Sequence, residues 1–223
     1  MVKIIGYGSL LSEVSARSTF GAALSNFRLA RVNNFRLARV NNFRRVFALP
    51  GSIFFRHGIA NMATKEIGGL MVEPSAGSSF IVSVFDIPEE QLDSFYKRES
   101  LYKIASVPYE ENDGTIDSAL MCLASNDEEL IANKGQAFFD DNYRAFGLHT
   151  VWGWDPDSGI LPCRVYLRHC ILAVQKLGKE VEEDFMINSY LGDRQTTIKD
   201  YVAKHPDIMN AVPPATLVGR YSG

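Results

Sequence analysis

The first half of the chain consists of short apolar runs separated by turn-forming residues, and apolar positions follow helical spacing from about residue 126 onward. Short β-branched and aromatic runs are typical of strands, whereas apolar residues at i, i+3, i+4 and i+7 are typical of amphipathic helices. We therefore predict a β-rich domain over residues 1–125 and a helical extension over residues 126–223 that packs on it. The expected fold class is α+β.

In the first domain, the same pattern separates strands from their connections. Asparagine pairs and small-residue clusters favour turns at Asn33-Asn34, Asn41-Asn42 and Ser75–Ser79. Residues 51–65 have no regular pattern and are predicted to form a loop. The predicted strands are Val2–Ile5, Val46–Leu49, Gly68–Pro74, Phe80–Ile87, Tyr102–Tyr109 and Ala119–Ala124.

Helices are predicted where start signals precede a periodic apolar stripe. A short helix is expected over residues 12–24, and another begins at Pro88, which is followed by two acidic residues as in many first turns. In the extension we expect helices from Pro162 to Leu177, from about Gly178 to Leu191 and from Thr196 to Lys204. The stripe of the first of these comprises Cys163, Tyr166, Leu167, Cys170, Ile171, Val174 and Leu177. Prolines 206, 213 and 214 interrupt the pattern, so the last residues are predicted to lie along the surface.

An eight-residue unit is repeated without change, because Phe27–Asn34 is identical to Phe35–Asn42. A period of eight is too short for a solenoid repeat, but an even period preserves the alternation of a strand. We predict either a small meander or one hairpin lengthened by a duplication. The region is rich in arginine, which we interpret as a solvated face rather than a polyanion site because the chain as a whole is acidic. The arginines are Arg28, Arg31, Arg36, Arg39, Arg44 and Arg45.

Composition limits the classes of function. The 223 residues are 46% hydrophobic, and the formal net charge is −3. This balance gives no general attraction to nucleic acid, no apolar run reaches the length of about 18 residues that a membrane span needs, and the sequence enters a strand directly after Met1. We expect a cytoplasmic protein with neither nucleic acid nor membrane as a partner. The three cysteines are expected to be free thiols.

The stretch from Ile4 to Leu11 is the first candidate for chemistry. Its glycines, Gly6 and Gly8, permit a sharp turn between a buried strand and a helix start, where free N–H groups can hold a carboxylate or an oxyanion. A tight turn without a ligand explains the stretch equally well. A dinucleotide site is rejected because Leu11 replaces the third glycine. A nucleophilic Ser9 is disfavoured because the flanking glycines of a nucleophile elbow are missing.

Two further candidates come from later segments. Cys163, His169 and Cys170 have spacings that match no zinc module, so we interpret them as core residues and expect no metal or cofactor. Glu99 follows Arg98 at the C-terminal end of the predicted helix. The negative end of the helix dipole would raise the pKa of this carboxylate, which favours a function for it or a cation beside it.

Two of these segments together resemble the γ-glutamylcyclotransferase-like proteins. The resemblance rests on Tyr7-Gly8-Ser9-Leu10 after the first strand and on the segment Leu92–Glu99 with Tyr102 beyond it. The Tyr-Gly-Ser-Leu loop and the Arg-Glu pair are most similar to the ChaC-type, glutathione-degrading branch. The chain departs from the Arg-Gly-Thr-Pro segment of that branch, since it has Arg56-His57-Gly58-Ile59.

The resemblance implies a small mixed β-barrel with flanking helices, to which this chain adds the helical C-terminal extension. It also implies release of 5-oxoproline from a γ-glutamyl substrate without a cofactor. Glu99 would be the catalytic general acid and base, and Tyr7, Gly8, Ser9 and Leu10 would bind the substrate. The alternative is a non-catalytic member of the same fold that binds a small ligand or a protein.

Overall fold

The computed structural model describes residues 1–11, 13, 16 and 33–223. The predicted helix over residues 12–24 and the first repeat unit up to residue 32 fall almost wholly outside the described residues. The strands are β1 (Val2–Gly6), β2 (Asn33–Pro50), β3 (Glu66–Ile87), β4 (Lys103–Glu110), β5 (Ile116–Leu123), β6 (Leu161–Pro162) and β7 (Ser189–Leu191). The helices are α2 (Ser52–Arg56), α3 (Leu92–Arg98), α4 (Asp127–Lys134), α5 (Gln136–Asn142), α6 (Arg164–Gln175), α7 (Lys179–Ile187) and α8 (Ile198–Lys204). Single 3₁₀ turns are η1 (Ser9–Leu11), η2 (Glu89–Gln91), η3 (Arg144–Phe146), η4 (Pro206–Asn210) and η5 (Ala215–Leu217).

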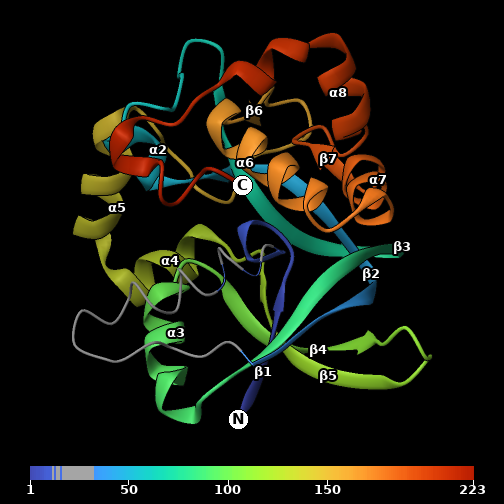
Figure 1. Cartoon of the computed structure of the whole chain (residues 1–223). Helices are drawn as coiled ribbons and strands as arrows, with labels where there is room; N and C mark the ends of the chain where they lie inside the picture. The colour runs from blue at the N-terminus through green and yellow to red at the C-terminus, as the bar shows by residue number, and fades with distance from the viewer. Residues whose placement is uncertain (12, 14–15, 17–32) are drawn as a thin grey trace.

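Five strands close into a barrel in the order β3, β1, β5, β4, β2 and back to β3. The barrel is mixed, because β1 runs parallel to β5 and antiparallel to β3, and the remaining neighbours are antiparallel. Figure 1 shows α3 beside this barrel and α6, α7 and α8 above it. The predicted α+β class, with a small mixed barrel and flanking helices, is therefore confirmed.

Strands β2 and β3 are longer than predicted, with 18 and 22 residues. The turns predicted at the two asparagine pairs and at Ser75–Ser79 were wrong, since these residues lie within strands. The ladder pairs Asn41 with Ser79 and resumes at Phe43 and Pro74, so the residues between form a bulge. Asn42 and Gly77 have positive φ there, and the Asn42 side chain accepts a hydrogen bond from the Gly77 N–H (3.1 Å). The turn-forming residues thus bend a continuous strand pair instead of ending it.

The helical extension shares the sheet and the core of the barrel. Strand β6 runs parallel to the start of β3, and β7 runs parallel to β2. The main core cluster combines barrel side chains such as Phe47 and Phe85 with Leu167, Phe185 and Ile198 of the extension. The predicted apolar stripe of α6 is confirmed by the burial of its members from Cys163 to Val174, apart from the half-buried Tyr166.

Two segments predicted to be irregular have defined places. Residues 51–65 contain α2, whose Phe54 is buried, although a loop was predicted. The last residues were predicted to lie on the surface, but Leu217 and Tyr221 are buried in a third core cluster with Phe54. Isolated apolar side chains without a period carry no local signal, so only the finished fold shows these contacts. Among the residues that the structure describes, no helix combines the length and apolar character that a membrane crossing requires.

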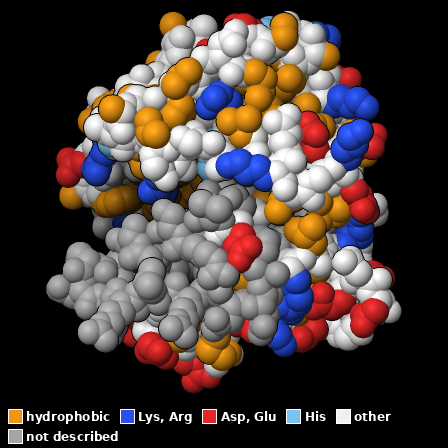
Figure 2. All heavy atoms as spheres, viewed as in Figure 1, with side chains coloured by type: hydrophobic (Ala, Val, Ile, Leu, Met, Phe, Trp, Pro, Cys, Tyr) orange, Lys and Arg blue, Asp and Glu red, His pale blue; other side chains and the backbone are white. Residues whose placement is uncertain are grey.

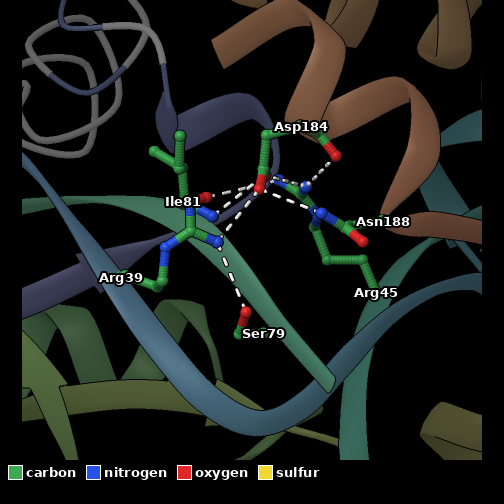
Figure 3. Close-up of polar contacts among 6 residues, drawn as sticks. All are labelled: Arg39, Arg45, Ser79, Ile81, Asp184 and Asn188. Atoms are coloured by element: carbon green, nitrogen blue, oxygen red, sulfur yellow. Dashed lines mark hydrogen bonds and ion pairs between the residues drawn. The ribbon is translucent and has the colours of Figure 1, made fainter. Parts of the chain in front are cut away.

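The arginine-rich region of β2 is tied into the protein by carboxylates. Arg45 is buried and pairs with Asp184 of α7, and Arg39 reaches the same carboxylate (Figure 3). Arg36 pairs with Glu111, and Arg44 with Glu73. In Figure 2, basic side chains lie among acidic ones on the visible face. These ion pairs favour a structural role for the described arginines over a polyanion site, whereas Arg28 and Arg31 lie outside the described residues.

Candidate active site

A cavity of about 270 Å³ lies where three segments distant in sequence meet. They are the loop after β1, the end of α3 and the segment that follows η5. Parts of β1, β2, α2, β3, β5 and α6 complete the wall. The described lining residues are Ile5, Gly6, Tyr7, Gly8, Ser9, Leu10, Leu49, Gly51, Ser52, Ile53, Phe54, Gly69, Leu70, Arg98, Glu99, Leu101, Tyr102, Cys122, Tyr166, Arg220 and Tyr221.

The turn at the end of β1 is folded so closely that Gly6 has no room for a side chain and Gly8 has little. A Cβ atom on Gly6 would lie 2.6 Å from the Ser83 hydroxyl oxygen and 2.7 Å from the Leu10 carbonyl oxygen. A Cβ atom on Gly8 would lie 3.0 Å from the Tyr166 hydroxyl oxygen. The Ser83 hydroxyl donates to the Leu10 carbonyl (2.7 Å), which holds the loop against β3. The glycine pattern is therefore explained by close approach of backbone and side chains at the cavity wall.

Glu99 is positioned by the end of α3. It is the C-cap residue of this helix, and its N–H donates to the Phe95 carbonyl (2.9 Å). Phe95 is buried in the main core, so the helix end is fixed to the barrel. The Nε atom of Arg98 lies 2.9 Å from Oε1 of Glu99, and the two side chains are 26% and 16% exposed. The carboxylate is thus held by one cation at the edge of the cavity.

Burial raises the pKa of the Glu99 carboxyl above its ordinary value, and the charges of Arg98 and Arg220 act in the opposite direction. The sequence predicted a raised pKa because of the helix dipole, and the structure gives the same direction from a different cause. The main cause is desolvation of the carboxylate, because the charged form loses water in the cavity wall. A raised pKa moves the carboxyl group toward the pH range in which a general acid and base works best.

The tyrosine and cysteine side chains of the wall are neutral at physiological pH. Burial raises the pKa of Tyr7, Tyr102 and Tyr166 well above the usual value of the phenol. Burial also raises the pKa of the Cys122 thiol well above its usual value. Burial also raises the pKa of Tyr221 to about 12, so four protonated phenols line the cavity. Cys122 provides no thiolate nucleophile.

Arg220 and Tyr221 line the cavity from a segment in which no site was predicted. The ring of Tyr221 packs against the rings of Phe54 (6.3 Å between centroids) and Tyr166 (5.7 Å). An arginine next to an aromatic residue is the one feature of the segment that could have drawn attention. No other motif lies at a recognisable spacing from Arg220 and Tyr221, so only the fold shows that they line the cavity.

All five residues selected from the sequence line this one cavity: Tyr7, Gly8, Ser9, Leu10 and Glu99. The structure also adds wall residues that the sequence did not indicate, among them Tyr166 and Arg220. The candidates Cys163, His169 and Cys170 are buried along α6, and the N–H of Gly223 donates to Nδ1 of His169 (2.9 Å). The roles of the five residues in binding and catalysis stay predictions.

Comparisons with known proteins find distant likenesses among solved structures. No family model matches the sequence, and no curated protein matches it. One solved structure is a yeast γ-glutamyl cyclotransferase specific to glutathione, with 13% sequence identity and a TM-score of 0.44. The match covers 94% of this chain and 95% of the yeast protein. Another γ-glutamyl cyclotransferase is 17% identical over 56% of this chain and 67% of that chain, with a TM-score of 0.40. An uncharacterised human protein is 17% identical over 63% of this chain and 84% of that chain, also with a TM-score of 0.40. At these identities the likenesses concern the fold alone.

Proposed function

We propose that this chain is a γ-glutamyl cyclotransferase-type enzyme that releases 5-oxoproline from a γ-glutamyl peptide or amine. The observation that supports it most directly is the cavity that Glu99 shares with the Tyr7–Leu10 loop. Its volume of about 270 Å³ is close to the lower end of the range for small-ligand sites, about 300–1,000 Å³. A substrate of a few residues suits such a space.

In the proposed reaction the α-amine of the substrate attacks its own γ-carbonyl carbon. A new C–N bond closes the five-membered ring, and the original amide C–N bond breaks to release an amine. The α-amine is protonated at neutral pH, so a base must first remove a proton. Glu99 accepts this proton and then delivers it to the leaving nitrogen. The attacking nitrogen loses a second proton when the lactam forms, and the released amine takes up this proton as an ammonium group, so neither water nor a cofactor is consumed. Because the attack is intramolecular, correct positioning supplies much of the rate.

The wall of the cavity offers groups for the other charges of this reaction. The backbone around Gly8 and Leu10 is proposed to hold the α-carboxylate of the substrate or the oxyanion that develops on the γ-carbonyl. The protonated phenols of Tyr7, Tyr102 and Tyr166 are additional donors in the same wall. Arg98 stabilises the ionised form of Glu99 between turnovers, because the two side chains form an ion pair of 2.9 Å.

That ion pair is also the observation that favours the alternative function. If Arg98 keeps Glu99 engaged throughout, the cavity binds a small carboxylated or γ-glutamyl ligand without turnover. Such a protein would show ligand-induced thermal stabilisation and no product. Both functions use the same cavity, and they differ in whether the proton of Glu99 moves.

The test is to substitute Glu99→Gln and to measure 5-oxoproline from glutathione, γ-glutamyl dipeptides and γ-glutamyl amines. Glutathione comes first because the Tyr7–Leu10 loop and the Arg98-Glu99 pair resemble the glutathione-degrading branch. We expect kcat to fall about a hundredfold to ten-thousandfold, since the amide cannot carry the proton. The melting temperature should stay nearly unchanged.

Glu73→Gln is the matched control. Glu73 is 17% exposed and ion-paired with Arg44, but it does not line the cavity. This variant should keep the turnover of the wild type. Wild-type product formation by Glu99→Gln would refute the role of Glu99, and ligand stabilisation without product in the wild type would favour the alternative.

A further inference from the structure

Arg220 places a guanidinium group in the wall of the cavity that contains Glu99. It follows η5, and its N–H donates to the Leu217 carbonyl (3.0 Å). Its guanidinium lies over the ring of Tyr221 at 5.7 Å from the centroid. The side chain is exposed, so the guanidinium is accessible from solvent as well as from the cavity.

The backbone that carries Arg220 is anchored on both sides. Before it, Leu217 is buried, and after it, Tyr221 is buried against His169 (5.4 Å between ring centroids). The N–H of Gly223 donates to Nδ1 of His169 (2.9 Å), and Nζ of Lys176 donates to the Gly223 carbonyl (2.6 Å). The backbone that carries the guanidinium is therefore fixed, so ordering of this segment adds no entropic cost to binding a ligand.

The charges of the described wall residues do not balance. Arg98 forms the ion pair with Glu99, and no carboxylate among the described residues pairs with Arg220. The wall thus holds two guanidinium groups and one carboxylate, although the chain as a whole carries a net charge of −3. The described wall therefore has one positive charge in excess, which favours an anionic group on the ligand.

Building on the proposed function, we propose that Arg220 is a specificity-determining residue that receives a carboxylate on the leaving part of a γ-glutamyl substrate. A planar guanidinium matches a carboxylate with two parallel N–H···O hydrogen bonds. The α-carboxylate of the glutamyl part is assigned to the Tyr7–Leu10 loop, so Arg220 recognises the second carboxylate, at the other end of the substrate. The site then selects γ-glutamyl peptides, whose leaving part is an amino acid or peptide, over γ-glutamyl amines.

A matched ligand pair isolates this second carboxylate. γ-Glutamyl-alanine and γ-glutamyl-alaninamide share the γ-glutamyl part and differ in charge at the far end. Binding is measured by titration calorimetry on Glu99→Gln, in which turnover does not consume the ligand. We expect the acid to bind about tenfold or more tightly than the amide, and we expect Glu99→Gln/Arg220→Gln to lose that difference. Glu99→Gln/Arg220→Lys should restore part of it.

The control is Arg144→Gln in the same background. Arg144 is exposed, pairs with Asp140 and does not line the cavity, so its substitution should leave the preference for the acid intact. Melting temperatures of all variants confirm that they are folded. Equal affinities for acid and amide before the Arg220 substitution, an equal loss for both ligands after it, or no binding of either ligand would overturn the assignment.

Turnover by the wild type separates this assignment from the proposed function. If the preference for the acid depends on Arg220 but no 5-oxoproline forms from any γ-glutamyl compound, the chemistry fails and Arg220 remains a ligand-binding residue. If 5-oxoproline forms but the preference is absent or independent of Arg220, the enzymatic function stands and the role of Arg220 fails.

Discussion

Arg45 and Asp184 lie 2.9 Å apart, the same distance as Arg98 and Glu99, but the two carboxylates have different surroundings. The first pair joins β2 of the barrel to α7 of the extension. The second lies at the end of α3, beside the cavity. Comparing them shows which features separate a carboxylate that holds a fold together from one that is available for chemistry.

The carboxylate of Asp184 is fully engaged (Figure 3). Besides Arg45 it accepts hydrogen bonds from the Ile81 N–H (2.9 Å), the Asn188 amide (3.0 Å) and Arg39 (3.4 Å). The Arg45 guanidinium lies over two rings, Phe80 at 4.6 Å and Phe185 at 4.7 Å. Arg45 is 1% exposed and Asp184 7%, so water has little access to either charge.

Glu99 keeps acceptor capacity unused. Among the described residues its side chain has one hydrogen-bonding partner, Arg98, and both side chains keep some exposure to solvent. The unused lone pairs belong to a group that lines a cavity. An ion pair by itself therefore does not decide between structure and function, whereas the number of donors and the space beside the carboxylate do.

The largest difference in stability is expected from the same substitution at the two carboxylates. Asp184→Asn leaves the buried charge of Arg45 without its counter-ion and should lower the free energy of unfolding by about 3–5 kcal/mol. Glu99→Gln should lower it by less than about 1 kcal/mol, because Arg98 can be hydrated and the desolvation of the carboxylate is removed. Urea unfolding of both variants beside the wild type measures the difference.

The double variant Arg45→Met/Asp184→Asn tests the reason for that loss. It removes the buried positive charge and keeps an oxygen that can accept from the Ile81 N–H, so it should be more stable than Asp184→Asn alone. Equal losses for Asp184→Asn and Glu99→Gln would remove the distinction between the two pairs.

The coupling between Arg98 and Glu99 should affect the pH dependence of activity. Glu99 must be ionised to accept a proton, so kcat/KM falls as the pH is lowered through its pKa. Burial raises this pKa and Arg98 lowers it, so Arg98→Gln raises it further. We expect the acidic limb of the profile for 5-oxoproline release to move to higher pH in this variant. Arg44→Gln, which removes the partner of Glu73, should leave the limb in place, and an unmoved limb in Arg98→Gln would contradict the coupling.

The smallest effect is expected at the outer edge of the Asp184 cluster. Arg39 is 39% exposed and lies 3.4 Å from Asp184, so its charge is screened by solvent. Arg39→Gln should change the free energy of unfolding by less than about 1 kcal/mol in the same urea experiment. A loss as large as that of Asp184→Asn would mean that the cluster acts as one unit.

Local patterns predicted the strands that begin and end near turn-forming residues, such as Tyr102–Tyr109, and the helix that begins after Pro88. They failed where turn-forming residues lie inside a long strand pair and form a bulge instead of a turn. Asn42 and Gly77 favour positive φ, and nothing local distinguishes a turn from a bulge, because the choice depends on whether the flanking strands continue to pair. The same holds for α2, whose Phe54 is fixed by Tyr166 and Tyr221.

The sequence by itself determined that a glycine-containing loop follows the first strand and that Glu99 stands at the end of a helix. These features depend on neighbouring residues, so they leave a pattern in the chain. Only the tertiary structure decided that this loop, Glu99 and Arg220 share one cavity and that Asp184 reaches Arg45. Contacts between distant segments are set by packing, and packing has no periodic signature in a single sequence.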